Sequence, residues 1–160
     1  MGHATPFDFA PDYRPAEGIG RFLCGTPVIL AIAALEAGVD VALTADAQAL
    51  RHKSQALGEL FIARVEALCN DSGLALASPR SALLRGSQVC LTHPAGYPVM
   101  QALIGRGVIC DFRAPDIMRF GFAPLYLRYT DIAEAARILA EVLATRAWDR
   151  PEYHRRAAVT

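Results

Sequence analysis

The spacing of apolar residues changes once along this chain of 160 residues, and the change limits the folds that it can adopt. Over residues 44–71, apolar side chains recur at helical spacing: Leu50, Leu57, Leu60, Phe61, Val65 and Leu68. They predict one long amphipathic helix that is capped at Thr44 and carries Lys53 on its polar side. After residue 73, apolar residues instead alternate in short runs, which is typical of strands.

Three further helices and four strands follow from the same patterns. The first helix covers "GTPVILAIAALEAG", with Thr26 as its cap and Gly38 as its end. It is apolar nearly all round, so we expect it to be buried on most sides. The strands lie in "LALAS", "SQVCLTH", "VICDFR" and "IMRFGFA", and a short helix covers "GYPVMQALIGRG". A final helix is capped by Thr130 and turns these side chains inward: Ile132, Ala135, Ile138, Leu139 and Val142. This order predicts an α+β fold.

Composition divides the chain and excludes several classes of function. We expect an extended proline-bearing arm over 1–20, an α+β domain over 21–148 and a polar tail over 149–160. The 16 basic residues equal the 16 acidic ones and form no stripe, which argues against a nucleic-acid partner. No apolar run reaches the roughly 18 residues of a membrane span, and no signal peptide is visible, so we expect a cytoplasmic protein without a membrane partner.

Metal and redox sites are not expected either. The chain has no C-x-x-C motif, and its four cysteines (Cys24, Cys69, Cys90 and Cys110) are far apart in apolar segments, where we expect them buried and reduced. No pair of histidines has metal-ligand spacing. We expect His52 on a solvated helix face and His93 in a turn.

Arg119 is the strongest candidate for a binding residue, because it interrupts an apolar run. Strand alternation places Arg119 and Gly121 on one face and the apolar side chains on the core face: Met118, Phe120 and Phe122. The missing side chain of Gly121 leaves room beside Arg119. A guanidinium next to a gap suits two-pronged capture of a carboxylate. Equally, Arg119 could form an ion pair with Asp111 or Asp116, while Arg113 is expected nearer to solvent.

Thr26 and Lys53 allow two interpretations each. Free N–H groups at the start of a helix suit a phosphate, so Thr26 could contact one or could be a simple cap. Lys53 is the only lysine, so any lysine chemistry within this chain must use it. Its place beside Arg51 and His52 on the polar side of the long helix argues against that chemistry, which needs a desolvated amine.

Three stretches of the chain resemble the C-terminal part of bacterial kynureninases: "RFLCGTPVI", "RGSQVCLTHPAGYPVMQALIGRGVICDFRAPDIMRFGFAPLY" and "RAWDRPEYHRRAAVT". The similarity covers essentially the whole chain. It implies the small C-terminal domain of a fold-type I enzyme that depends on pyridoxal 5'-phosphate, with helices packed on a short, mostly antiparallel sheet. The family hydrolyses L-kynurenine to anthranilate and L-alanine, in tryptophan catabolism and NAD synthesis, and works as a homodimer.

The resemblance also implies roles for single residues. Arg119 matches the arginine that binds the substrate carboxylate, Gly25 a position that lines the pocket for the substrate ring, and Thr26 a contact of the cofactor phosphate. The Gly-Thr pair is similar to members that prefer kynurenine over its 3-hydroxy derivative. Lys53 does not match the lysine that holds the cofactor covalently.

By this resemblance, we expect the 160 residues not to include the family's large cofactor domain. We therefore expect no catalytic residue here, no covalently bound cofactor, and no activity without the N-terminal domain or a second chain that supplies it. The alternative is a non-catalytic module that binds a carboxylate ligand or a partner protein.

Overall fold

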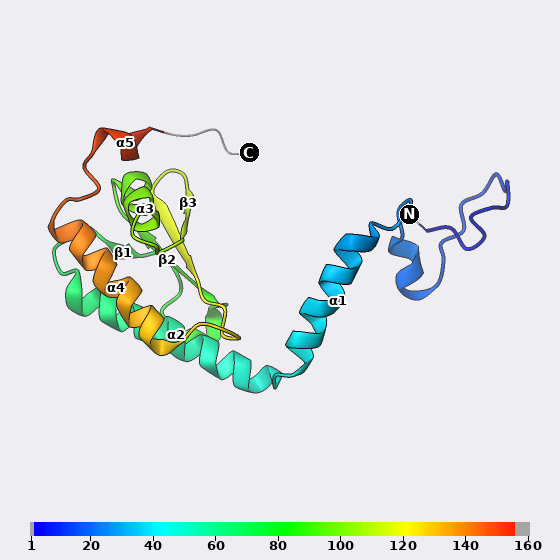
Figure 1. Ribbon diagram of the computed structural model, residues 1–160, viewed down its shortest axis with the longest axis horizontal. Coiled ribbons are helices and arrows are strands. Elements are labelled where there is room, and N and C mark those ends of the chain that lie inside the picture. The colour runs from blue at the N-terminus through cyan, green and yellow to red at the C-terminus, as the bar shows by residue number, and fades with distance from the viewer. Residues whose placement is uncertain (1, 156–160) are drawn as a thin grey trace. The chain divides into compact units, whose positions relative to one another are not determined.

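The computed structural model describes residues 2–155, which fall into two compact units, Met1–Thr44 and Ala45–Thr160. We call them the N-terminal unit and the C-terminal unit; Figure 1 shows the elements of each. The boundary at Thr44 differs from the expected ones after residues 20 and 148, and that three-part division stays a prediction.

The N-terminal unit begins with an arm that folds back on itself. The backbone N–H of Gly2 donates to Arg21 O at 2.9 Å, and Ala4 N donates to Arg14 O at 2.8 Å. A short 3-10 helix, η1 (Gly18–Phe22), closes the arm. A Cβ at position 2 would lie 2.0 Å from Gly20 O, so only glycine fits there.

The second element of this unit, α1 (Ile29–Leu43), differs at both ends from the prediction. Val28 takes the N-cap position without a side-chain hydrogen bond, so Thr26 is not the cap. Gly38 lies inside the helix instead of ending it, since a single internal glycine costs only about 1 kcal/mol relative to alanine. Thr44 caps this helix at its C-terminus, where its Oγ1 donates to Val41 O at 2.7 Å.

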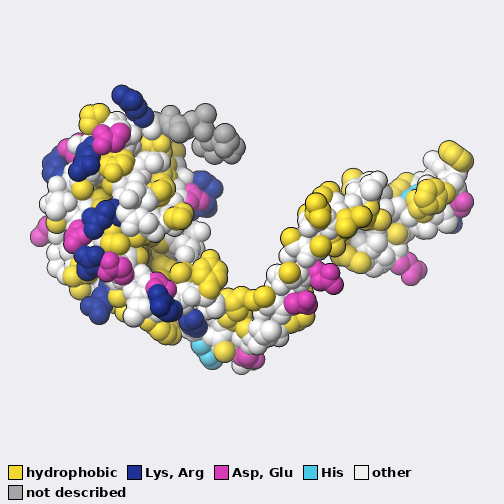
Figure 2. Space-filling model, in the orientation of Figure 1, with side chains coloured by type: hydrophobic (Ala, Val, Ile, Leu, Met, Phe, Trp, Pro, Cys, Tyr) yellow, Lys and Arg dark blue, Asp and Glu magenta, His cyan; other side chains and the backbone are white. Residues whose placement is uncertain are grey.

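The expected burial of α1 is wrong for the described residues, since none of its side chains is buried. Leu30 is 86% exposed and Leu43 is 78% exposed. Figure 2 shows hydrophobic side chains over much of this helix. The apolar side chains of α1 that the sequence pattern identified are therefore exposed.

The C-terminal unit combines helices with one sheet. Its elements are α2 (Ala47–Leu68), β1 (Ala75–Leu76), η2 (Ala82–Leu84), β2 (Gln88–Thr92), α3 (Gly96–Ile104), β3 (Asp111–Arg113), β4 (Ile117–Gly121), α4 (Tyr129–Ala144) and α5 (Pro151–His154). The sheet has the order β1-β2-β4-β3, and every neighbouring pair is antiparallel. The predicted α+β class, with helices on a short antiparallel sheet, is confirmed.

Capping residues account for the small shifts in the helix starts. Asp46, rather than Thr44, caps α2, because its Oδ1 accepts from Ala49 N at 2.7 Å. Arg128, rather than the expected Thr130, takes the N-cap position of α4, and Asp131 Oδ2 accepts from Arg128 N at 2.8 Å. The described part of the predicted polar tail forms α5, which packs on α3.

The core lies between the sheet and the pair α2 and α4, which run side by side (Figure 1). Its fully buried side chains come from helices and strands alike: Leu57, Phe61, Val89, Val99, Leu103, Met118, Leu139 and Val142. Four of the five side chains expected to point inward from α4 are buried, and Ala135 is half-buried. Since these helices cover one face of the sheet, the opposite face is available for other contacts.

Candidate functional site

Arg119 lies on the face of the sheet that points away from the core. Its neighbours along β4, Met118 and Phe120, are 0% and 4% exposed, so the predicted alternation is confirmed. In the ladder, Arg119 pairs with Cys90 on β2 and with Asp111 on β3. The sheet therefore fixes the position of Arg119 from both sides.

The guanidinium of Arg119 is bound at one corner. Its Nη2 donates to Asp111 Oδ2, so Asp111 rather than Asp116 is the partner. This hydrogen bond raises the pKa of Arg119. Its Nε is shielded from solvent and has no hydrogen-bond partner within the described residues. Buried N–H groups are normally paired, so this Nε–H is an unusual donor that Arg119 has not used.

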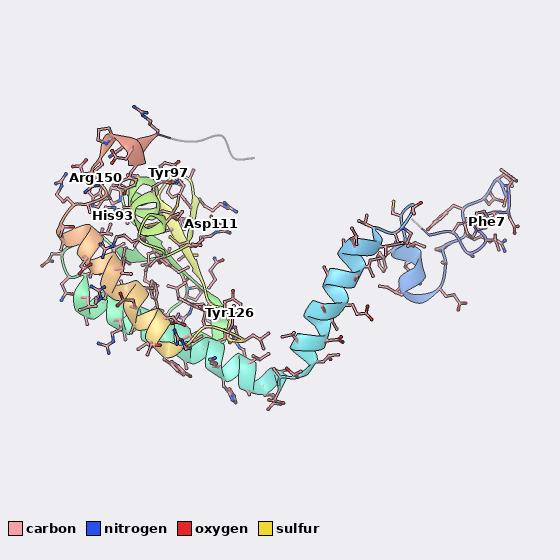
Figure 3. All side chains as sticks on the ribbon, viewed as in Figure 1. Phe7, His93, Tyr97, Asp111, Tyr126 and Arg150 are labelled. Atoms are coloured by element: carbon pink, nitrogen blue, oxygen red, sulfur yellow. The ribbon has the colours of Figure 1, made fainter. Side chains whose placement is uncertain are left out.

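Asp111 is shared with a second arginine. Its Oδ1 accepts from Arg113 Nη1 at 3.0 Å, while Arg113 also donates to Phe112 O at 3.1 Å. Figure 3 shows Asp111 on β3, on the side of the strands opposite α4. Arg113 is near solvent, as expected, but it is connected to Arg119 through one carboxylate. Two guanidinium groups and one carboxylate leave one formal positive charge on this face.

The space next to Arg119 is open at Gly121, as the sequence predicts. A Cβ at this position would meet no atom within 4 Å. A cavity of about 400 Å³ is also lined by Gly121, but not by Arg119, and its other lining side chains are mainly apolar and include Phe61, Phe120 and Ile132. Its charged rim is already paired, for example Asp131 with Arg128, so Arg119 marks a more distinctive chemical site than the cavity.

Gly25 and Thr26 belong to the N-terminal unit and precede α1. Both are exposed, and Gly25 has a φ of +69°, a left-handed conformation that favours glycine. Their assembly with Arg119 into one site stays a prediction.

Lys53 lies in the helical layer, away from the face that carries Arg119. Arg128 and, to a smaller extent, Lys53 lower the pKa of Asp131, which places the ammonium close to the start of α4. Lys53 is half-buried on α2. Lys53 and Arg119 are therefore on opposite sides of the sheet.

The sequence pattern did not identify two polar residues, Arg85 and His93, as buried. Arg85 is 6% exposed, pairs with Glu59 and donates to Pro79 O at 2.7 Å and Arg80 O at 2.9 Å.

His93 was expected in a turn, and it does follow β2, but it is only 7% exposed. Its Nδ1 accepts from Ala95 N at 3.0 Å, so Nε2 donates to Ser72 O at 3.1 Å, and burial lowers its pKa. Both residues connect loops to the core.

Other predicted site types can be compared with the described part of the chain. Residues 2–155 contain no group of three or more His, Cys, Asp or Glu that could hold a metal, and no helix there is long and apolar enough to cross a membrane. All four cysteines are free; Cys110 is buried as expected, whereas Cys24 is exposed. Burial, with a smaller effect of Asp111, raises the pKa of Cys110 to about 12.

Comparison with known proteins assigns the family. Residues 50–139, more than half of the chain, match the sequence model of the kynureninase C-terminal domain. A kynureninase of Burkholderia mallei (strain SAVP1) is 50% identical over 159 residues, which are 99% of this chain and 38% of that protein. A kynureninase of Pseudomonas fluorescens is 47% identical over 160 residues, again 38% of its length. The chain thus spans about 38% of the length of these curated relatives, and it belongs to the kynureninase C-terminal domain family.

Proposed function

We propose that this chain supplies the substrate-carboxylate site of a cytoplasmic kynureninase, a hydrolase that converts L-kynurenine to anthranilate and L-alanine in tryptophan catabolism and NAD synthesis. The observation that carries the proposal is Arg119, held on the open face of the sheet with an unused, shielded Nε–H. A planar guanidinium that has further N–H donors besides the one given to Asp111 suits a carboxylate. The names of the relatives, all kynureninases, support the same activity.

The residues of this chain fit one part of a pyridoxal 5'-phosphate site. Thr26, with an exposed hydroxyl group ahead of α1, would contact the phosphate, and Gly25 would leave space for the substrate ring. The bound cofactor acts as the electron sink for cleavage of the substrate side chain. Lys53 does not fit the covalent attachment of the cofactor, since it lies half-buried on α2 in the helical layer, away from the face that carries Arg119.

The rest of the site would come from an N-terminal cofactor domain, in a homodimer. The relatives are much longer than the segment that this chain matches, which supports such a partner. Arg119 would bind and orient the α-carboxylate, and the open space at Gly121 would admit it. Alone, the 160-residue chain would be inactive.

A chimera tests this proposal. The chain replaces the matching 38% of the Pseudomonas fluorescens kynureninase, and anthranilate formation from L-kynurenine is followed by fluorescence. We expect activity from the chimera and none from the chain alone. An inactive chimera that folds and binds the cofactor would contradict the proposed role.

A second function is favoured by one observation, the exposed apolar surface of α1. A patch of this kind often marks a protein contact. A non-catalytic module that binds a carboxylate ligand or a partner protein would use α1 without any cofactor domain. In that case the chimera would be inactive, whereas the isolated chain would still associate in sedimentation experiments, and Leu30→Glu would reduce the association.

A further inference from the structure

The carboxylate of Asp111 is divided between two arginines that differ in exposure. Arg119 is 29% exposed and bonds Oδ2, while Arg113 is 60% exposed and bonds Oδ1 at 3.0 Å. Asp111 stands directly opposite Arg119 in the β3–β4 ladder, so the backbone keeps the two side chains together. Asp111 is therefore a carboxylate of the protein itself that the backbone holds next to the proposed carboxylate site.

The carboxylate of Asp111 has two effects on Arg119 as a binding residue. It neutralises part of the charge that would attract a ligand, and it occupies one donor of the guanidinium. Arg119 has five N–H donors, of which one meets Asp111, while the Nε–H has no partner among the described residues. A ligand carboxylate would thus find Arg119 partly occupied but not saturated.

Arg113 limits the effect of Asp111. Its Nη1 holds the oxygen of Asp111 that Arg119 does not use. Without Arg113, Asp111 could give both oxygens to Arg119 in a two-pronged pair, the strongest arrangement of these groups. Cys90, the cross-strand neighbour on the other side of Arg119, is a free thiol and adds no second carboxylate.

We propose that Asp111 competes with the ligand carboxylate for Arg119, and that Arg113 weakens this competition by holding the other oxygen of Asp111. The inference rests on the proposed role of Arg119. It makes Asp111 and Arg113 positioning residues that set carboxylate affinity through Arg119, without contacting the ligand themselves.

The competition predicts opposite effects for two neutralising substitutions. Asp111→Asn keeps the shape but removes the competing charge, so carboxylate affinity should rise about two- to five-fold, the range of a partly exposed ion pair. Arg113→Ala should lower affinity by about the same factor, since Asp111 then turns fully to Arg119. In the Asp111→Asn background, Arg113→Ala should have little further effect.

The experiment uses the whole 160-residue chain and sodium acetate as the probe. The Nε–H resonance of Arg119 is assigned by its loss in Arg119→Lys, and its shift is followed by NMR as acetate replaces chloride at constant ionic strength. Arg80→Ala is the matched control, because it breaks an exposed pair with Glu66 and should leave acetate affinity unchanged.

Three results would overturn the proposal. The first is that Asp111→Asn binds acetate more weakly. The second is that Arg113→Ala lowers acetate affinity equally with and without Asp111. The third is that acetate does not shift the Nε–H resonance of Arg119 in any variant that retains it. The first would make Asp111 an anchor of Arg119, and the second would mean that Arg113 acts by its own charge. Failure of the proposed enzyme function appears separately, as an inactive chimera, and does not change the acetate titration.

Discussion

The rings of Phe61 on α2 and Phe120 on β4 lie 4.8 Å apart, centroid to centroid, and join the helical layer to the sheet. Phe61 is fully buried. Phe61→Ala should lower the free energy of unfolding by about 3–5 kcal/mol, through lost transfer energy and the cavity left behind. Urea denaturation measures the change. Leu84→Ala, at a side chain that is 76% exposed, is the control and should stay within about 0.5 kcal/mol of the unsubstituted chain.

Arg85 and Glu59 should contribute unequally to stability although they form one ion pair. Arg85→Met removes the donor of two carbonyl groups, of Pro79 and Arg80, in an exposed loop. Each of these lost hydrogen bonds should cost about 0.5–1.5 kcal/mol. Glu59 is 52% exposed, so Glu59→Gln should cost at most about 1 kcal/mol. Equal losses in thermal or urea unfolding would mean that the ion pair, not the carbonyl contacts, holds Arg85.

His93 should make stability depend on pH near neutrality. Burial lowers its pKa in the folded chain, whereas the unfolded chain titrates at about 6.5. Between these two values the unfolded state binds the extra proton, so the free energy of unfolding rises with pH through this window and levels off above about 6.5. Acidification from pH 7 therefore destabilises the fold. His93→Gln can still donate to Ser72 O but cannot titrate, and its unfolding profile should be flatter; parallel profiles would assign the slope to other groups.

Arg119 should control substrate use in the chimera. Arg119→Lys keeps the charge but loses the planar donor edge, and one charge-assisted hydrogen bond is worth about 1.5–3 kcal/mol. We expect kcat/KM for L-kynurenine to fall about 10- to 100-fold, and further for Arg119→Ala, with cofactor absorbance retained.

Arg80→Ala is the matched control for Arg119, since it removes an exposed arginine that pairs with Glu66. It should leave kcat/KM unchanged. Near-normal kcat/KM in Arg119→Ala would make Arg119 a structural partner of Asp111 alone.

Lys53 should not become a cofactor lysine in the isolated chain. Mixing the chain with pyridoxal 5'-phosphate, reducing with borohydride and mapping the label by mass spectrometry should give only weak, non-selective modification. Stoichiometric labelling of Lys53 together with anthranilate formation would contradict the assignment of the cofactor site to another domain.

The strands could be predicted because one face of the sheet is buried. Met118 and Phe120 alternate with Arg119, and this period is visible in the sequence alone. The partner of Arg119 could not be chosen, because Asp116 is nearer in sequence whereas the β3–β4 register brings Asp111 opposite. Register depends on tertiary packing and not on local pattern.

The helix starts and the buried arginine show a different limit. Thr26 and Thr44 are both good caps, yet Val28 and Asp46 take those positions: Asp46 accepts from a backbone N–H of its helix, whereas Val28 makes no side-chain hydrogen bond, so a favourable cap residue does not by itself fix where a helix begins. Arg85 is satisfied mainly by the carbonyl groups of a loop, and these leave no mark in the pattern of side chains. The burial of Arg85 could therefore be recognised only from the structure.

Because side chains alternate between the two faces of the sheet, those on the open face can be substituted while those in the core are kept. The residues of the open face share strands with the core but not its packing: Gln88, Cys90, Thr92, Asp111, Arg113, Ile117, Arg119 and Gly121. A combinatorial library at these positions would explore new ligand preferences while the side chains that hold the unit together stay unchanged. Met118 and Phe120 would have to be excluded from it, since they are 0% and 4% exposed. The same short strands thus offer a platform for directed evolution.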